Sequence, residues 1–72
     1  KMKKKVLIEG MSCEHCVKHV KAALSKLAGV TKVDVDLASK RAIIEASKDV
    51  SDESIKSAVE DAGYETAGIE NI

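Results

Sequence analysis

The sequence predicts an α+β fold in which two helices cover one face of a four-stranded antiparallel sheet. Several short segments alternate apolar and polar residues, as a half-buried strand does, and two longer segments space their apolar residues at the helical period. A strand–helix–strand plan also occurs twice within the 72 residues, with an Ala-Gly step after each helix, at Ala28-Gly29 and Ala62-Gly63. A chain of this length is expected to form a single domain over residues 1–72.

The first half of the chain begins with a predicted strand at Lys4–Ile8, followed by a loop at Glu9–Cys13. A helix is expected from Glu14 to about Leu27, because its apolar residues recur on one side at the helical period. Gly29 stands where a left-handed residue often ends a helix. The next segment, Val30–Leu37, alternates valine and leucine with charged residues, so we expect a strand with one solvated face.

The second half repeats this plan. After a short turn, Arg41–Ala46 is predicted to be a strand, and Ser51 is a preferred N-cap residue for a helix that runs to about Ala62. Tyr64–Ile69 is expected to be the last strand, although Gly68 interrupts its pattern. A split βαβ unit that occurs twice gives the ferredoxin-like βαββαβ open-faced sandwich. The alternative is another α+β layering of the same elements.

Composition and charge exclude several classes of function. The 12 Lys+Arg residues balance the 12 Asp+Glu residues, and Tyr64 is the only aromatic residue, so a nucleic-acid partner is not expected. The apolar runs are too short to span a bilayer, so direct membrane insertion is not expected either. The chain has no proline and only two cysteines. It therefore lacks both the cis-proline of thioredoxin-like redox folds and the cysteines of a disulfide framework.

The segment Gly10–Cys16 carries the chemistry and reads Gly-Met-Ser-Cys-Glu-His-Cys. Cys13 is expected before or at the start of the first helix and Cys16 in its first turn, so their sulfurs can face one point. Unpaired N–H groups and a partial positive charge at a helix start favour the thiolate form of cysteine. The two thiols are therefore expected to be anionic near neutral pH. The simpler interpretation is two free thiols, or a disulfide without function.

Two thiolates suit some metal ions better than others. A structural zinc site takes four protein ligands, and iron–sulfur clusters usually take four cysteines. Soft thiolates favour Cu(I), which accepts coordination by only two sulfurs. Such a site is open on its solvent side, so an incoming thiolate can bind before an original ligand leaves. This behaviour suits delivery of the ion better than storage.

On this motif and on the order of its elements, the chain resembles the heavy-metal-associated domain family. That family includes the CopZ-like copper chaperones of bacteria and the N-terminal modules of copper-transporting P-type ATPases, and its GMxCxxC motif matches Gly10–Cys16. The resemblance implies a non-enzymatic cytoplasmic carrier of Cu(I), held by Cys13 and Cys16, with no organic cofactor. The implied partner is a copper-transporting P-type ATPase or its metal-binding domain, and a copper-bridged homodimer is an alternative assembly. Relatives with similar motifs bind Hg(II), Zn(II) or Cd(II).

The resemblance also assigns supporting roles. It implies that Met11 is buried beneath the loop, although a thioether is chemically suited to Cu(I) as well. Gly10 and Ser12 complete the loop, and Tyr64 matches an aromatic position near the metal in bacterial members. Tyr64 has the simpler interpretation of packing the end of the core. His15 is the alternative third ligand, but its place in the first turn is expected to direct it toward solvent.

The remaining polar residues have two interpretations. Lys18 and Lys21 are close to the metal loop and are expected to steer docking onto an acidic partner surface. The simpler interpretation for each is a solvated helix face, as it is for His19. The competing function from another class is a thiol–disulfide oxidoreductase, since Cys-x-x-Cys at a helix start is also used in redox enzymes. The missing proline argues against it.

Overall fold

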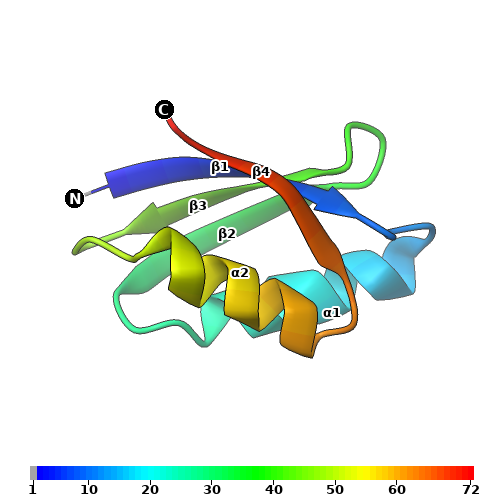
Figure 1. The fold of residues 1–72 in the computed structure, drawn as a ribbon, viewed down its shortest axis with the longest axis horizontal. Helices are drawn as coiled ribbons and strands as arrows, with labels where there is room; N and C mark the ends of the chain where they lie inside the picture. The colour runs from blue at the N-terminus through cyan, green and yellow to red at the C-terminus, as the bar shows by residue number, and fades with distance from the viewer. Residues whose placement is uncertain (1) are drawn as a thin grey trace.

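Two helices lie on one face of a four-stranded antiparallel sheet in the computed structural model, which describes residues 2–72 (Figure 1). The elements in chain order are β1 (Met2–Glu9), α1 (Glu14–Ser25), β2 (Val30–Asp36), β3 (Arg41–Ala46), α2 (Asp52–Asp61) and β4 (Glu65–Asn71). The strands are ordered β2-β3-β1-β4, and each neighbouring pair is antiparallel. The predicted ferredoxin-like βαββαβ sandwich is confirmed.

The core lies between the sheet and the helix layer. Val6 of the inner strand β1 pairs with Ala42 on one side and with Ile69 on the other, and all three lie on the helix-covered side of the sheet. The stripe predicted for each helix packs onto this side, with Leu24 of α1 and Ile55 of α2 fully buried. The buried hydrophobic residues are Val6, Ile8, Met11, Val20, Leu24, Val33, Ala42, Ile44, Ala46, Val50, Ile55 and Val59.

Several boundaries differ from the expectations by one or two residues: β1 begins at Met2 and ends at Glu9, β2 ends at Asp36, and β4 runs from Glu65 to Asn71. α1 ends at Ser25 rather than near Leu27, because the N–H groups of Lys26 and Leu27 bond to carbonyls three residues back, at 3.4 and 3.2 Å. Those bonds belong to a tighter turn that ends the regular helix. The irregularity expected at Gly68 is present, but it does not end the strand. β4 continues to Asn71, and its register against β1 shifts beside Gly68, which pairs with Leu7 while Ile8 pairs with Thr66.

The loops of the molecule divide between two ends (Figure 1). One end holds the β1–α1 loop, the β2–β3 turn and the short connection from α2 to β4, and the start of β1 and the end of β4 lie at the other end. The motif Gly10–Cys16 therefore lies next to the residues that follow α2. Neither helix in residues 2–72 is long and apolar enough to cross a bilayer.

Candidate metal centre

The two cysteines sit at the start of α1, as the sequence predicts. Cys13 is the N-cap residue with an extended backbone, and its carbonyl accepts the first helical hydrogen bonds, from the N–H groups of Cys16 at 3.1 Å and Val17 at 3.3 Å. Cys16 therefore lies in the first turn. Both cysteines are free, and their sulfur atoms are 3.6 Å apart. Cys13 is exposed and Cys16 is half-buried, so the pair opens toward solvent on the Cys13 side.

The loop before the helix is held from two directions. Met11 is only 4% exposed and belongs to the hydrophobic core, which anchors the loop from below. Gly10 has φ +98°, in the left-handed region, and a Cβ added there would lie 3.4 Å from Cδ1 of Tyr64. The Tyr64 ring thus packs against the loop backbone. Gly10 supplies the left-handed backbone of this turn.

Tyr64 is positioned by the way α2 ends. Gly63, at φ +96°, donates its N–H to the Glu60 carbonyl at 2.9 Å, and the Tyr64 N–H bonds to the Val59 carbonyl at 3.1 Å. This pair of bonds is a Schellman motif, which reverses the chain directly after a helix. The motif leads Tyr64 back across the core toward the β1–α1 loop. The tyrosine therefore reaches the cysteine pair from the second half of the chain.

The surroundings of Cys16 favour its thiolate. The pKa of the Cys16 thiol is lowered from 9.0 to about 6, first by a hydrogen bond from the Ser12 backbone and then by the side chains of Tyr64 and Cys13. The same contact raises the pKa of Tyr64, because its hydroxyl donates to the Cys16 sulfur. At neutral pH Cys16 is therefore mainly ionised. From the sequence, Ser12 is predicted only to be part of the loop. Its backbone hydrogen bond to the Cys16 sulfur could not be predicted, because no pattern of side chains indicates a backbone donor.

The other candidate residues have exposed side chains. Ser12 and His15 are exposed, as are Lys18 and Lys21 on α1. Within residues 2–72 no three His, Cys, Asp or Glu side chains are grouped so that they could hold a metal ion. The structure therefore brings together Cys13 and Cys16, with Tyr64 beside them, and does not add His15 to the pair as a third ligand.

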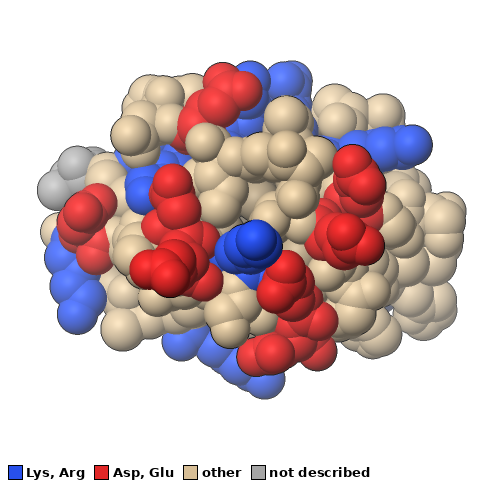
Figure 2. Space-filling view, in the orientation of Figure 1, with Lys and Arg blue, Asp and Glu red and all other residues tan. Residues whose placement is uncertain are grey.

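Charge is distributed unevenly around this end of the molecule. Figure 2 shows acidic side chains gathered over α2, and mostly uncharged surface at the end where the β1–α1 loop lies. The exposed acidic residues of α2 are Asp52, Glu53, Glu60 and Asp61. α1 instead exposes Lys18 and Lys21. The helix layer is thus acidic on α2 and basic on α1.

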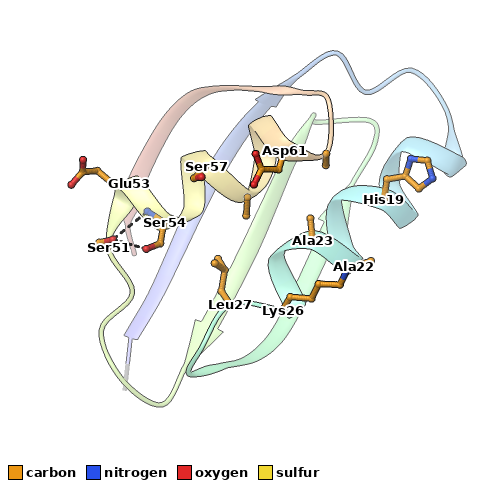
Figure 3. A pocket seen from close by; sticks show the side chains of 12 residues that line it. His19, Ala22, Ala23, Lys26, Leu27, Ser51, Glu53, Ser54, Ser57 and Asp61 are labelled. Atoms are coloured by element: carbon orange, nitrogen blue, oxygen red, sulfur yellow. Dashed lines mark hydrogen bonds between the residues drawn. The ribbon is translucent and has the colours of Figure 1, made fainter.

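A groove of about 960 Å³ lies between the two helices (Figure 3). Small side chains such as Ala22, Ala23 and Ser57 line much of it, and neither cysteine does. His19 stands at the end of the groove nearest the β1–α1 loop. The groove is therefore separate from the sulfur pair.

The fold and the paired thiols define a small soft-metal-binding domain. Residues 5–65 match the family described as the heavy-metal-associated domain, and the chain belongs to this family.

Individual relatives show the range of proteins that contain such a domain. The chain is 44% identical over 63 residues to the copper chaperone CopZ of Staphylococcus haemolyticus, covering 86% of this chain and 93% of the relative. It is also 44% identical over 57 residues to a mercuric reductase of Shewanella putrefaciens, covering 79% of this chain but 10% of that protein. The crystal structure of a copper-binding domain from HMA7, a P-type ATPase, superposes with a TM-score of 0.84 at 37% identity, covering 100% and 95% of the two chains.

Proposed function

We propose that this domain binds one Cu(I) ion between the thiolates of Cys13 and Cys16 and passes it by ligand exchange to a partner protein. The observation that carries the proposal is the pair of free sulfurs 3.6 Å apart at an open helix start, with no third protein ligand grouped beside them in residues 2–72. Soft thiolates favour Cu(I), and two of them satisfy it. The domain acts as a carrier, without catalytic turnover.

The sulfur separation indicates how the site responds to the ion. Two metal–sulfur bonds of about 2.3 Å, the length found for zinc thiolates, would hold the sulfurs about 4.6 Å apart in a straight line. The observed 3.6 Å suits a bent arrangement, so linear coordination requires the pair to open. Cys13 is exposed and precedes the regular helix, whereas Cys16 is fixed in the first turn. Cys13 is therefore the ligand that moves.

Transfer proceeds through exchange of sulfur ligands without a change in oxidation state. A thiolate of the partner forms a bond to copper on the exposed Cys13 side, giving a three-coordinate ion. The bond to Cys13 then breaks, and a second partner thiolate displaces Cys16 in the same way. Copper remains Cu(I) throughout, and each departing cysteine is left as a thiolate. For Cys16 this form is favoured by its pKa of about 6.

The partner that fits this chemistry is a copper-transporting P-type ATPase or its metal-binding domain, because relatives of this chain include such a domain. Docking is steered by Lys18 and Lys21, which are exposed on the helix that carries the cysteines. Reversing one of these charges in Lys18→Glu is expected to slow copper transfer and to flatten its dependence on ionic strength. Equal rates and equal salt slopes for the two proteins would reject steering by Lys18.

A cytoplasmic location follows from the same chemistry, since the two thiols must stay reduced to bind the ion. The mercuric reductase relative supports Hg(II) as the second candidate ion. A copper-bridged dimer is the alternative loaded form, in which two exposed Cys13–Cys16 pairs share the metal.

The test is a titration of the reduced protein with Cu(I) in the presence of a competing Cu(I) chelator, repeated with Hg(II) and Zn(II). We expect one Cu(I) per chain for the wild type and no tight binding for Cys16→Ser. The matched variant His15→Gln is expected to leave the Cu(I) affinity unchanged if only Cys13 and Cys16 bind the ion. It would lower that affinity if His15 were a third ligand. A wild-type protein that cannot compete with a weak thiol for Cu(I) would disprove the proposal.

A further inference from the structure

We propose that His15 and His19 form a second metal site on the exposed side of α1, which binds a borderline divalent ion such as Cu(II), Ni(II) or Zn(II). The two histidines are the only ones in the chain. Both lie within α1, and both are exposed. This site does not depend on the Cu(I) site, because it uses imidazole rather than thiolate ligands.

The helix places the two rings as neighbours. Residues four apart in an α-helix advance by about 400°, or about 40° beyond one full turn. Their Cβ atoms are then about 5–6 Å apart on the same face. Since α1 runs unbroken from Glu14 to Ser25, His15 and His19 are held in this relation by backbone hydrogen bonds. The same spacing places two zinc-binding histidines on one face of a helix in the His-Glu-x-x-His motif.

Imidazole determines which ions the pair takes. Neutral imidazole nitrogens bind divalent zinc, copper and nickel well, with zinc–nitrogen bonds of about 2.0–2.1 Å. Two such bonds from adjacent turns close a chelate ring on one ion. Within the described residues no third His, Cys, Asp or Glu side chain joins the pair in a metal-holding cluster, so water fills the remaining positions. The site is therefore a weak and rapidly exchanging one.

The surroundings of His19 leave its ring accessible. Figure 3 shows the ring extending from α1 at the end of the interhelical groove, well separated from Asp61 on α2. No hydrogen bond or ion pair of either histidine side chain is found among residues 2–72. Metal binding at the pair thus needs no existing side-chain contact to break.

The experiment uses the double variant Cys13→Ser/Cys16→Ser, so that no thiol binds or reduces the probe, which is Cu(II). We expect electron paramagnetic resonance to show two nitrogen ligands on the bound ion. Adding His19→Gln is expected to weaken Cu(II) binding by about tenfold or more, or about 1.4 kcal/mol for each factor of ten. Cu(II) is also expected to raise the thermal unfolding midpoint of the double variant, because a ligand that binds only the folded state stabilises it.

A register control keeps the number of histidines constant. In the same background, His19→Gln combined with Lys21→His puts the second imidazole about 600° from His15, on a different face of α1. We expect this protein to bind Cu(II) as weakly as His19→Gln alone. Equal Cu(II) affinity in all three proteins would overturn the proposal. Cu(I) binding by Cys13 and Cys16 is measured separately on His19→Gln and is expected to be unchanged, so failure of one site is distinguishable from failure of the other.

Discussion

The two helices start in opposite ways. At α2, the Ser51 side chain accepts a hydrogen bond from the Ser54 N–H at 3.2 Å. The buried Lys4 ammonium donates to the Val50 carbonyl at 2.8 Å and to the Asp52 carboxylate at 2.6 Å. At α1, the N-cap residue is Cys13, which makes no side-chain capping hydrogen bond and is exposed. Equivalent positions in the two halves of the fold are thus tied down in one case and left open in the other.

This difference teaches how the fold divides stability from chemistry. The first N–H groups of any helix lack partners within the helix and need an acceptor. At α2 the Ser51 hydroxyl fills part of that need, and the first turn is acidic at Asp52 and Glu53, as the helix dipole favours. At α1 the cap position holds a thiol instead, so the same electrostatic field is available to a thiolate and its metal ion. The account therefore predicts different consequences for changes at the two starts.

The largest expected effect comes from converting the open start into a closed one with Cys13→Ser. Serine is a preferred N-cap residue, and its hydroxyl can accept from the first-turn N–H groups. We expect Cu(I) binding to fall by several orders of magnitude while the free energy of unfolding of the apo-protein rises by about 0.5–1 kcal/mol. Chelator competition and urea unfolding measure the two quantities. A variant that loses stability would contradict the view that the α1 cap is left unfilled.

The second effect concerns the closed start. Lys4→Met removes a buried ammonium with two partners, one of which is the Val50 carbonyl. Because hydrogen bonds of charged groups contribute about 1.5–3 kcal/mol, we expect a loss of about 2 kcal/mol of stability and no change in Cu(I) affinity. The matched control is Lys5→Met, whose ion pair with Glu70 is longer, at 3.6 Å, and more exposed. Equal losses in the two variants would show that the buried Lys4 contacts contribute no more than the exposed Lys5–Glu70 pair.

Removing only the cap of α2 is expected to have a smaller effect. Ser51→Ala leaves the Ser54 N–H without its acceptor and should lower the free energy of unfolding by about 1 kcal/mol. The comparison with Cys13→Ser is the informative one, because one N-cap position gains a hydroxyl and the other loses one. Chemical denaturation of both apo-proteins in reductant supplies the measurement. If Ser51→Ala is as stable as the wild type, the capping bond makes no net contribution.

A further expected effect is a dependence of stability on pH. The pKa of Cys16 is about 6 in the folded protein, against 9.0 for an unperturbed thiol. A depressed pKa contributes stability that is fully present above pH 9 and is lost as pH falls toward 6, because the unfolded chain takes up the proton first. The free energy of unfolding should therefore decline over this window relative to Cys16→Ser. Parallel pH profiles for the two proteins would rule out a depressed pKa.

Tyr64→Phe sharpens the same point. It removes the hydroxyl that donates to the Cys16 sulfur but keeps the ring that packs against Gly10. We expect the pKa of Cys16 to rise only part of the way to 9.0, because the Ser12 backbone contributes more than Tyr64. NMR titration of the Cys16 Cβ signal follows this change. An unshifted titration would mean that the tyrosine serves the core alone.

Much of this arrangement follows from sequence patterns that report local physics. The strand alternation predicts the sheet, and the Arg41–Ala46 strand is confirmed with its predicted bounds. Ser51 is confirmed as an N-cap, and Gly29 is confirmed in the left-handed region. The positions of Cys13 and Cys16 at the start of α1 follow in the same way, because a loop glycine and a helical period fix where the helix begins.

The features that sequence did not reveal depend on contacts between distant residues. Lys4 is in phase with Val6 on the buried face, but its partners lie 46 and 48 residues away, around the start of α2. A thiolate at Cys16 is expected from its place at a helix start, but the largest cause of its lowered pKa, a hydrogen bond from the Ser12 backbone, is one that every residue type except proline could offer. The end of α1 was misplaced because Leu27 continues the apolar period although its N–H group already belongs to a tighter turn. Periodicity reports burial, and it does not report which hydrogen bonds close a helix.

X-ray absorption at the copper edge, on reduced protein loaded with one equivalent of Cu(I), tests the open helix start most directly. If Cys13 and Cys16 hold the ion without further help, the first coordination shell contains two sulfur atoms and no nitrogen. Loss of the two-sulfur shell in Cys16→Ser and an unchanged spectrum in His15→Gln would support the same conclusion. A first shell dominated by nitrogen or oxygen in the wild type would contradict the account.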